Sequence, residues 1–184
     1  MPKIVRMKVF KFGGASVKDA AAVRNVASIL QLFEGQKLAI VISAMGKTTN
    51  AMENIAKAHW NRNAEEFSNL VDERQHFHLD IMNDLFEDAS APIFGEIEGV
   101  FAGLRNNFDG IVSENFDFEY DQIVSLGEVI STKIISAYLS SQGVACQWAD
   151  ARMLIATDRK FREAEIDWDL TTTHFEKRFL PNFD

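Results

Sequence analysis

The first 43 residues carry three hydrophobic patterns in succession. Residues 7–12 alternate apolar and polar positions and end at two glycines, which predicts a strand that runs into a glycine turn. Residues 20–33 repeat apolar positions at helical spacing and are followed by Gly35, a residue type that commonly ends a helix. Residues 38–42 are wholly apolar and mostly β-branched, which favours a parallel strand covered on both faces. The order strand, helix, strand predicts a βαβ unit and therefore an α/β domain with a parallel sheet.

The middle of the chain is predicted to be mainly helical. Residues 50–85 show a helical pattern with interspersed charges, and a second helical stretch surrounds Phe101. We interpret residues 50–105 as a helical excursion from the sheet. A long apolar stripe predicts a further helix over residues 120–142. Short apolar runs at residues 144–148 and 153–157 predict two further strands. A last periodic stretch at residues 171–179 predicts a helix.

Composition and charge narrow the class of protein. The 184 residues fit one domain by the prior of roughly 100–200 residues per domain. A formal net charge of −8 argues against sequence-independent nucleic-acid binding, which depends on neutralising phosphates. The single cysteine, Cys146, excludes an intramolecular disulfide, and every apolar run is far shorter than the roughly 20 residues that cross a bilayer. We therefore expect a cytoplasmic protein that binds neither nucleic acid nor membrane.

The first segment with candidate chemistry is Lys11-Phe12-Gly13-Gly14, at the end of the first predicted strand. A lysine at a strand end can place its ammonium beside a phosphate, and glycines let backbone N–H groups approach the same phosphate. The alternative interpretation is a surface lysine before an ordinary turn. Spacing alone does not decide between the two.

The second candidate segment, residues 43–50, directly follows the second predicted strand, where ligands bind in α/β folds. Its Gly-Lys-Thr is not a P-loop, because Val41 stands where that motif needs its first glycine. Asn50 with Glu53 three residues later has the pattern of a capping box, which predicts that a helix starts there. Ser43 and Thr49 could still offer hydroxyls to a ligand at that helix terminus.

The third candidate segment is Ser125-Leu126-Gly127-Glu128. Ser125 and Glu128 also have the spacing of a capping box, and the pattern alone favours that structural interpretation. The functional alternative is that Glu128 faces a cleft and binds a cationic group of a substrate. His76 and His78 lie two apart in a predicted helix and should point to different faces, which argues against a metal site.

Together these segments resemble the aspartate kinase family of the amino-acid kinase fold. The matching residues, in order along the chain, are 11–17 (KFGGASV), 41–50 (VISAMGKTTN), 125–131 (SLGEVIS), 150–152 (DAR) and 157–158 (TD). Their order and rough spacing also match, over most of the chain. The sequence departs at Ala15, where the family commonly has threonine, but a small residue still fits the glycine turn.

The larger departure is at the end of the chain. The family's catalytic domain continues well past the length of this sequence, with a second half that holds most of the nucleotide pocket, and regulatory domains usually follow it. The resemblance therefore implies that residues 1–184 are the amino-terminal, aspartate-binding part of a three-layer α/β sandwich with a mainly parallel sheet. On this view the chain is truncated before the nucleotide-binding half and is inactive alone.

The resemblance also implies an activity: transfer of a phosphoryl group from ATP, with Mg²⁺, to the side-chain carboxylate of L-aspartate. The product, aspartyl phosphate, would enter lysine, threonine and methionine synthesis. Lys11 is the expected catalytic residue, and the expected nucleotide-binding residues are Lys11, Phe12, Gly13 and Gly14. The expected aspartate-binding residues are Ser43, Thr49 and Glu128, with Glu128 binding the α-ammonium group. No residue of this chain is expected to be a metal ligand.

Two alternatives stay open. The chain could be a non-catalytic module that retains part of an aspartate site, because half a kinase cannot enclose ATP and exclude water. It could also belong to another amino-acid kinase, such as one that acts on acetylglutamate. The long helical excursion and the Ser-Leu-Gly-Glu segment favour the aspartate kinases. Family habit implies a possible homodimer.

Overall fold

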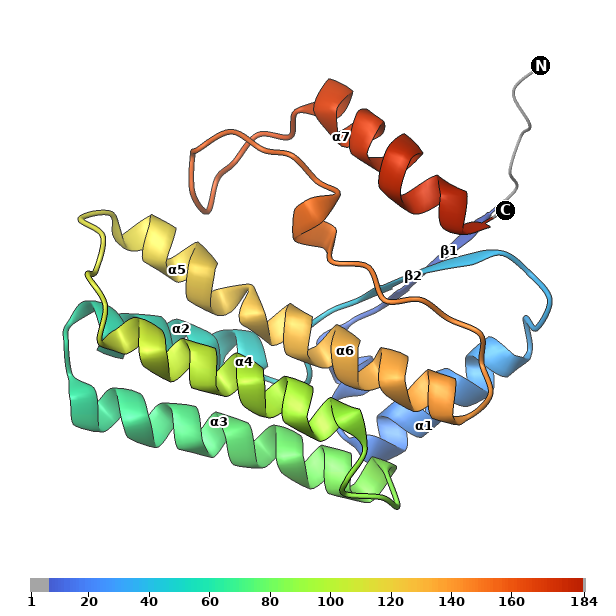
Figure 1. Cartoon of the computed structure of the whole chain (residues 1–184), viewed down its shortest axis with the longest axis horizontal. Helices are drawn as coiled ribbons and strands as arrows, with labels where there is room; N and C mark the ends of the chain where they lie inside the picture. Colours follow the sequence, from blue (N-terminus) through green and yellow to red (C-terminus); the bar gives the residue numbers. More distant parts are fainter. Residues whose placement is uncertain (1–6, 184) are drawn as a thin grey trace.

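A computed structural model of the chain describes residues 7–183 (Figure 1). Strand β1 (Lys8–Phe12), helix α1 (Ala20–Gln31) and strand β2 (Leu38–Ile42) form the predicted βαβ unit. The strands are parallel, and Lys8 pairs with Leu38 at one end and Phe12 with Ile42 at the other. Asp19 caps α1 by accepting a hydrogen bond from the amide of Ala22 at 2.8 Å. The predicted α/β class with a parallel sheet is confirmed.

The two faces of this sheet have different surroundings. Alternate residues of both strands, including Phe10 and Ile40, pack against the core, and Phe10 meets Phe33 beyond α1 with ring centroids 4.7 Å apart. Val9 and Val41, on the other face, are 62% and 52% exposed. The prediction that both faces of the second strand are covered is therefore wrong for the part of the molecule that the structure describes.

Three helices form the excursion that the sequence predicts: α2 (Thr48–Trp60), α3 (Ala64–Leu85) and α4 (Pro92–Phe108). The single pattern over residues 50–85 is divided between α2 and α3. Arg62 adopts a positive φ of 55°, and the Asn63 side chain then accepts a hydrogen bond from the Glu66 amide to start α3. Side chains of these helices, among them Met52, Ile97 and Phe101, are fully buried in the core.

The predicted helix over residues 120–142 is two helices, α5 (Phe116–Val124) and α6 (Leu126–Ser141), which meet at Ser125. Helix α5 starts four residues earlier than predicted because the Asn115 side chain accepts hydrogen bonds from two amides. The combined stretch Phe116–Ser141 is long and apolar enough to span a membrane. Its most apolar 18 residues have a mean hydropathy of 1.3, but 56% of them are buried inside the molecule. A core helix of a soluble protein meets the same criterion of length and composition, so the expectation of no membrane partner stays a prediction.

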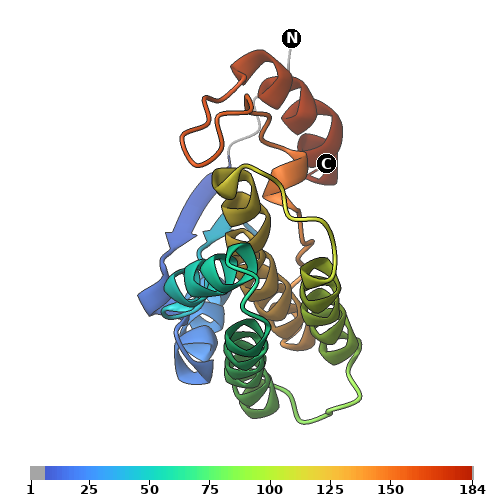
Figure 2. The ribbon, with the colours of Figure 1, turned by 90° about the vertical axis from the view of Figure 1, so that its left-hand side faces the viewer.

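The last 40 residues differ most from prediction. Residues 144–150 are extended but join no sheet, and residues 151–153 form a 3₁₀ turn, so the two further strands predicted there are wrong. Only a single antiparallel bridge, between Thr157 and Ile166, forms in this region. Helix α7 (Trp168–His174) continues into a π-helical turn (Phe175–Phe179), which confirms the last predicted helix in position. Figure 2 shows this terminal part standing apart from the bundle of α2–α6.

Candidate functional site

Lys11 lies at the carboxyl end of β1, where its side chain is exposed. A Cβ atom built on Gly13 would lie 3.2 Å from Nζ of Lys11, so the ammonium group lies over the glycine turn. Lys11 forms no ion pair with a carboxylate among residues 7–183. An unpaired cation above exposed backbone is a suitable arrangement for binding an anion such as a phosphate.

Gly14 lacks a side chain for a different reason. A Cβ atom at Gly14 would lie 2.8 Å from the carbonyl oxygen of Ala44 and 2.9 Å from that of Gly46. The amide of Gly46 donates a hydrogen bond to the Gly14 carbonyl at 3.1 Å, and the amide of Ser43 donates one to Phe12 at 3.0 Å. The glycine turn after β1 and the loop after β2 are thus held in direct backbone contact.

The loop after β2 leads into α2 without the predicted capping box. Helix α2 starts at Thr48, whose amide donates a hydrogen bond to Met45, so Asn50 lies inside the helix and is not its N-cap. Glu53 forms an ion pair with Lys57 at 2.9 Å instead of turning back to the helix start. The helix begins earlier because the tight turn over residues 45–48 already directs the chain into it. Thr49 is consequently in the first helical turn, where its side chain is exposed.

The amino-terminal end of α6 packs directly on this loop. A Cβ atom at Gly127 would lie 3.1 Å from Cγ2 of Thr48 and 3.4 Å from Cβ of Ala44. One turn later, the Ser131 hydroxyl donates a hydrogen bond to the carbonyl oxygen of Ser43 at 2.8 Å. The absence of a side chain at Gly127 therefore lets α6 approach α2 closely.

Glu128 follows Gly127 in the first turn of α6 and is half-buried. Ser125 occupies the N-cap position, but its side chain makes no capping hydrogen bond, so the predicted capping box with Glu128 is wrong. No ion pair joins Glu128 to a cation among residues 7–183. A carboxylate that is free of structural partners beside a tightly packed loop is available to bind a cationic group of a ligand.

The candidate site is thus assembled from three segments that are distant in sequence. The turn after β1, the loop 43–48 and the start of α6 touch through Gly14, Ala44, Thr48 and Gly127. Two of these segments also contain the unpaired charged residues: Lys11 precedes the turn after β1, and Glu128 lies at the start of α6. An open depression of about 360 Å³ at the start of α3, around Asn63 and Leu70, contains none of these residues.

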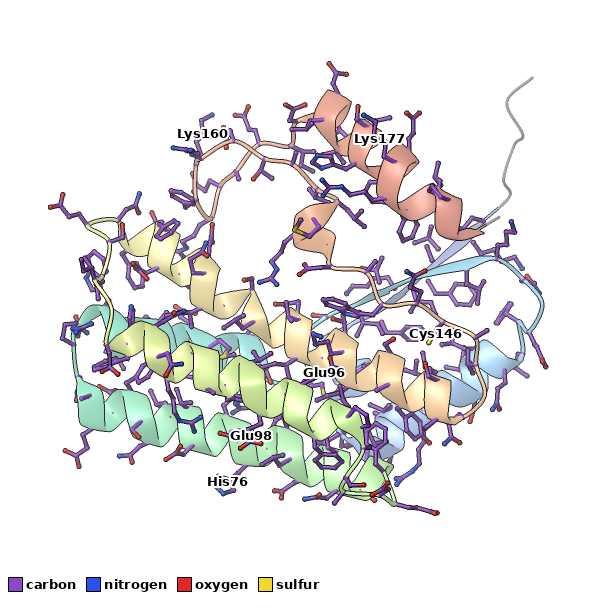
Figure 3. The ribbon with its side chains drawn as sticks, viewed as in Figure 1. His76, Glu96, Glu98, Cys146, Lys160 and Lys177 are labelled. Carbon is purple, nitrogen blue, oxygen red and sulfur yellow. The ribbon has the colours of Figure 1, made fainter. Side chains whose placement is uncertain are left out.

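The extended segment 144–150, part of which the sequence predicts to be a strand, lies against α6. It runs back along α6: Cys146 (Figure 3) lies near Ser140. The Trp148 indole donates a hydrogen bond to the Thr132 hydroxyl at 2.9 Å. That hydroxyl in turn donates to the carbonyl oxygen of Glu128 at 2.7 Å. Beyond it, the Arg152 guanidinium lowers the pKa of Asp150. Sequence reasoning missed Trp148 because nothing in a short apolar run distinguishes an edge strand from a segment held by its side chains.

The described residues do not form a site for a resident metal. Nowhere in residues 7–183 do three or more His, Cys, Asp or Glu side chains gather in a way that could hold a metal ion. His76 is exposed and His78 is fully buried on α3, as expected for positions on different helix faces.

Comparison with known proteins gives consistent results. The amino acid kinase family model matches residues 6–182. Aspartokinase 1 of Arabidopsis thaliana, a chloroplast protein, is 33% identical over 148 residues, which are 78% of this chain and 25% of that protein. The aspartokinase of Chlamydia trachomatis is 29% identical over 90% of this chain and 35% of that protein. The crystal structure of E. coli aspartokinase III with aspartate and ADP has a TM-score of 0.83 at 25% identity, over 96% of this chain and 38% of that one.

The chain spans only about a fifth to a third of the length of the curated relatives it resembles. The match to the family model nevertheless covers nearly every described residue, including all three segments of the candidate site. The chain belongs to the amino acid kinase family.

Proposed function

We propose that the protein to which this chain belongs transfers the γ-phosphoryl group of ATP to the side-chain carboxylate of L-aspartate. The observation that supports the proposal is the contact of three segments through Gly14, Ala44, Thr48 and Gly127. Lys11 and Glu128, neither of which forms an ion pair among residues 7–183, lie in two of these segments. Its curated relatives are named aspartokinases, and the E. coli enzyme was crystallised with aspartate and ADP. The product would be aspartyl phosphate, the first intermediate toward lysine, threonine and methionine.

The reaction itself demands little acid–base chemistry from the protein. An oxygen of the ionised carboxylate attacks the γ-phosphorus, the bond from that phosphorus to the β,γ-bridging oxygen breaks, and ADP leaves with the electron pair. Since the nucleophile is already an anion, no general base is needed, and catalysis depends on positioning and on charge neutralisation. The residues around the loop offer donors and charges of that kind.

Each site residue receives a role in this proposal. Lys11, whose ammonium lies over Gly13, neutralises charge on the phosphates, and the backbone of residues 12–14 borders them. Glu128 binds the α-ammonium group of aspartate, and the hydroxyls of Ser43 and Thr49 donate hydrogen bonds to its carboxylates. Mg²⁺, when bound with ATP, would neutralise part of the charge on the phosphates.

Calorimetric titration of the 184-residue chain with L-aspartate tests the substrate role directly. We expect measurable binding, and we expect Glu128→Gln to weaken it about tenfold or more, because a partly desolvated charged hydrogen bond contributes roughly 1.5–3 kcal/mol. Glu98→Gln is the control, since Glu98 is an exposed carboxylate on α4 (Figure 3). Equal affinity of the wild-type chain and Glu128→Gln for aspartate would refute the role of Glu128.

The nucleotide role of Lys11 is tested on the full-length protein to which this chain belongs, titrated with ATP and Mg²⁺ and separately with aspartate, because the resemblance implies that most of the nucleotide pocket lies outside residues 1–184. Lys11→Met should weaken ATP binding and leave aspartate binding unchanged, whereas Glu128→Gln should do the reverse. The separation arises because the two side chains are assigned to different ligands. A common loss of both affinities in either variant would contradict the assignment.

A second function, that of a non-catalytic aspartate-binding module, is the alternative to be tested against this one. A hydroxamate assay for aspartyl phosphate on the 184-residue chain distinguishes the two. Product formation supports a complete catalyst, and calorimetric binding without product supports the module. A panel of amino acids, including acetylglutamate, identifies the acceptor.

A further inference from the structure

Arg74 is a charged side chain of α3 for which the proposed reaction has no role. Its side chain is only 11% exposed, and its Nε atom is buried without a hydrogen-bond partner among residues 7–183. The carboxylate of Glu73, at 3.9 Å, is itself 73% exposed and provides a weak ion pair. Burial lowers the pKa of Arg74, which means that the fold holds this cation at a cost in solvation free energy.

The contacts of Arg74 lead to the candidate site. Its Nη1 atom donates a hydrogen bond to the hydroxyl of Thr48 at 3.4 Å. Its guanidinium lies over the ring of Phe77, 4.6 Å from the centroid. The Cζ atom of Phe77 lies 3.5 Å from the Cβ position of Gly46. Arg74 and Phe77, one turn apart on α3, therefore support the loop at Gly46 and at Thr48.

Thr48 is the point at which α3 and α6 both hold this loop. Its side chain is fully buried, with its hydroxyl toward Arg74 and its methyl group 3.1 Å from the Cβ position of Gly127. The preceding turn is closed by the hydrogen bond from the Thr48 amide to Met45 at 3.0 Å. Thr49, which follows directly, and Ser43, five residues earlier, are the two hydroxyl residues assigned to aspartate.

We propose that Arg74 is a positioning residue that fixes the first turn of α2 through Thr48 and so sets the aspartate-binding hydroxyls; this role in ligand binding rests on the proposed function. Lysine cannot fully replace it, because only the guanidinium combines a flat face for Phe77 with several N–H donors. Removal of one buried charge is strongly destabilising when it leaves its partner charge buried, but Glu73 is 73% exposed and stays hydrated in Arg74→Met. A role limited to packing therefore predicts that Arg74→Met leaves the loop unchanged, whereas the positioning role predicts that the loop loosens.

Amide hydrogen exchange on the 184-residue chain tests the positioning role without any ligand. In Arg74→Met, the amides of Thr48 and Ala51 should exchange about three- to tenfold faster, as expected when a net hydrogen-bond contribution is lost. The amide of Asn61, at the far end of α2, should keep its rate. Arg74→Lys should restore part of the protection. Unchanged exchange at Thr48 and Ala51, or an equal increase at Asn61, would overturn the proposal.

The matched control is Arg105→Met. Arg105 also bridges two helices, from α4 to Asp72 and Gln75 on α3, but it does not contact the loop. It should leave exchange at Thr48 unchanged. Thr48→Val keeps the buried shape and removes the acceptor, so its exchange effect should not add to that of Arg74→Met in the double variant. Additive effects would show that the two side chains act independently and would overturn the proposal.

Aspartate titration then separates this proposal from the proposed function. If the wild-type chain binds aspartate, Arg74→Met should weaken binding about threefold or more, and Arg105→Met should not. Wild-type binding with an unaffected Arg74→Met would overturn the ligand-binding part. If the wild-type chain does not bind aspartate, the proposed function fails for this chain, and the exchange rates still decide whether Arg74 fixes the turn.

Discussion

Gly13 and Gly14 are adjacent in the turn after β1, yet they lack side chains for different physical reasons. At Gly13 the space that a Cβ atom would approach is occupied by the Lys11 ammonium, a group that can move. At Gly14 the same space is bounded by two backbone oxygens of the neighbouring loop, which cannot move without separating the strands' ends. The first glycine therefore accommodates a functional side chain, and the second permits the backbone contact on which the site is built.

This difference predicts the effect of adding one methyl group. Gly14→Ala should destabilise the chain by about 1–3 kcal/mol, the range for overpacking, because Cβ would lie 2.8 and 2.9 Å from the carbonyl oxygens of Ala44 and Gly46. The free energy of unfolding is measured by urea denaturation. Gly99→Ala in α4 is the control: beyond the neighbouring residues and the backbone of its own helix, no atom lies within 4 Å of its Cβ position, so alanine should stabilise the helix by roughly 0.5–1 kcal/mol. Equal stability of Gly14→Ala and wild type would show that the two loops separate freely.

Among the elements, long periodic segments could be predicted from the sequence, and interruptions could not. The βαβ unit and the helical excursion follow from hydrophobic spacing alone. The break at Arg62 and Asn63 and the junction at Ser125 lie within continuous helical patterns, where tertiary packing decides the outcome. The extended segment 144–150 was mistaken for a strand because its hydrogen bonds come from side chains such as Trp148.

The candidate site shows the same limit. Motif resemblance is what points to Lys11 and Glu128, because spacing alone leaves Lys11 undecided between a phosphate site and an ordinary turn and favours a helix cap for Glu128. Arg74 was not singled out, because in sequence it is one charge of a charged helix beside Asp72 and Glu73. Its contact with Thr48, 26 residues away in sequence, exists only after α2 and α3 pack together.

Helix α3 also predicts a pH dependence of stability. His76 and His78 both hydrogen-bond through Nδ1 to the carbonyl four residues earlier, but His76 is exposed (Figure 3) and His78 is fully buried. Burial, assisted by the charge of Arg74, lowers the pKa of His78 to about 4. The unfolded chain, with a histidine pKa near about 6.5, binds this proton first as pH falls. The contribution of the neutral, buried His78 to the free energy of unfolding is therefore fully present above pH 6.5 and is lost as pH falls toward 4.

The expected size of this loss is about 3 kcal/mol, because each unit of pKa difference corresponds to about 1.4 kcal/mol. Urea denaturation between pH 7.5 and pH 4 measures it as the difference between wild type and His78→Leu, since other groups titrate equally in both. His76→Gln should follow the wild-type curve. A His78→Leu chain that loses as much stability on acidification as wild type would contradict the burial of His78 as a neutral side chain.

In the whole molecule, one face of the two-stranded sheet is part of the hydrophobic core and the other face is open to solvent. Its inner face joins the core through Phe10, Phe12 and Ile40, whereas its outer face presents Val9 and Val41 beside Lys11. The candidate site lies at the carboxyl edge of this same sheet. An exposed apolar surface next to a ligand site is typical of a face that another protein surface covers.

The open face predicts that the chain self-associates through the sheet. Val9 and Val41 are more than half exposed and lie on adjacent strands, where Val9 pairs with Ala39 and Val41 with Lys11. The double variant Val9→Thr/Val41→Thr replaces two exposed methyl groups in each copy of the chain. If all four become buried in a symmetric pair, association should weaken by about 3.2 kcal/mol, more than a hundredfold. Sedimentation velocity over a range of concentrations measures this. Leu32→Thr is the control, since Leu32 is 79% exposed but follows α1 and belongs to neither strand. A concentration-independent monomer, or an equal loss of association in Leu32→Thr, would exclude the sheet as the interface.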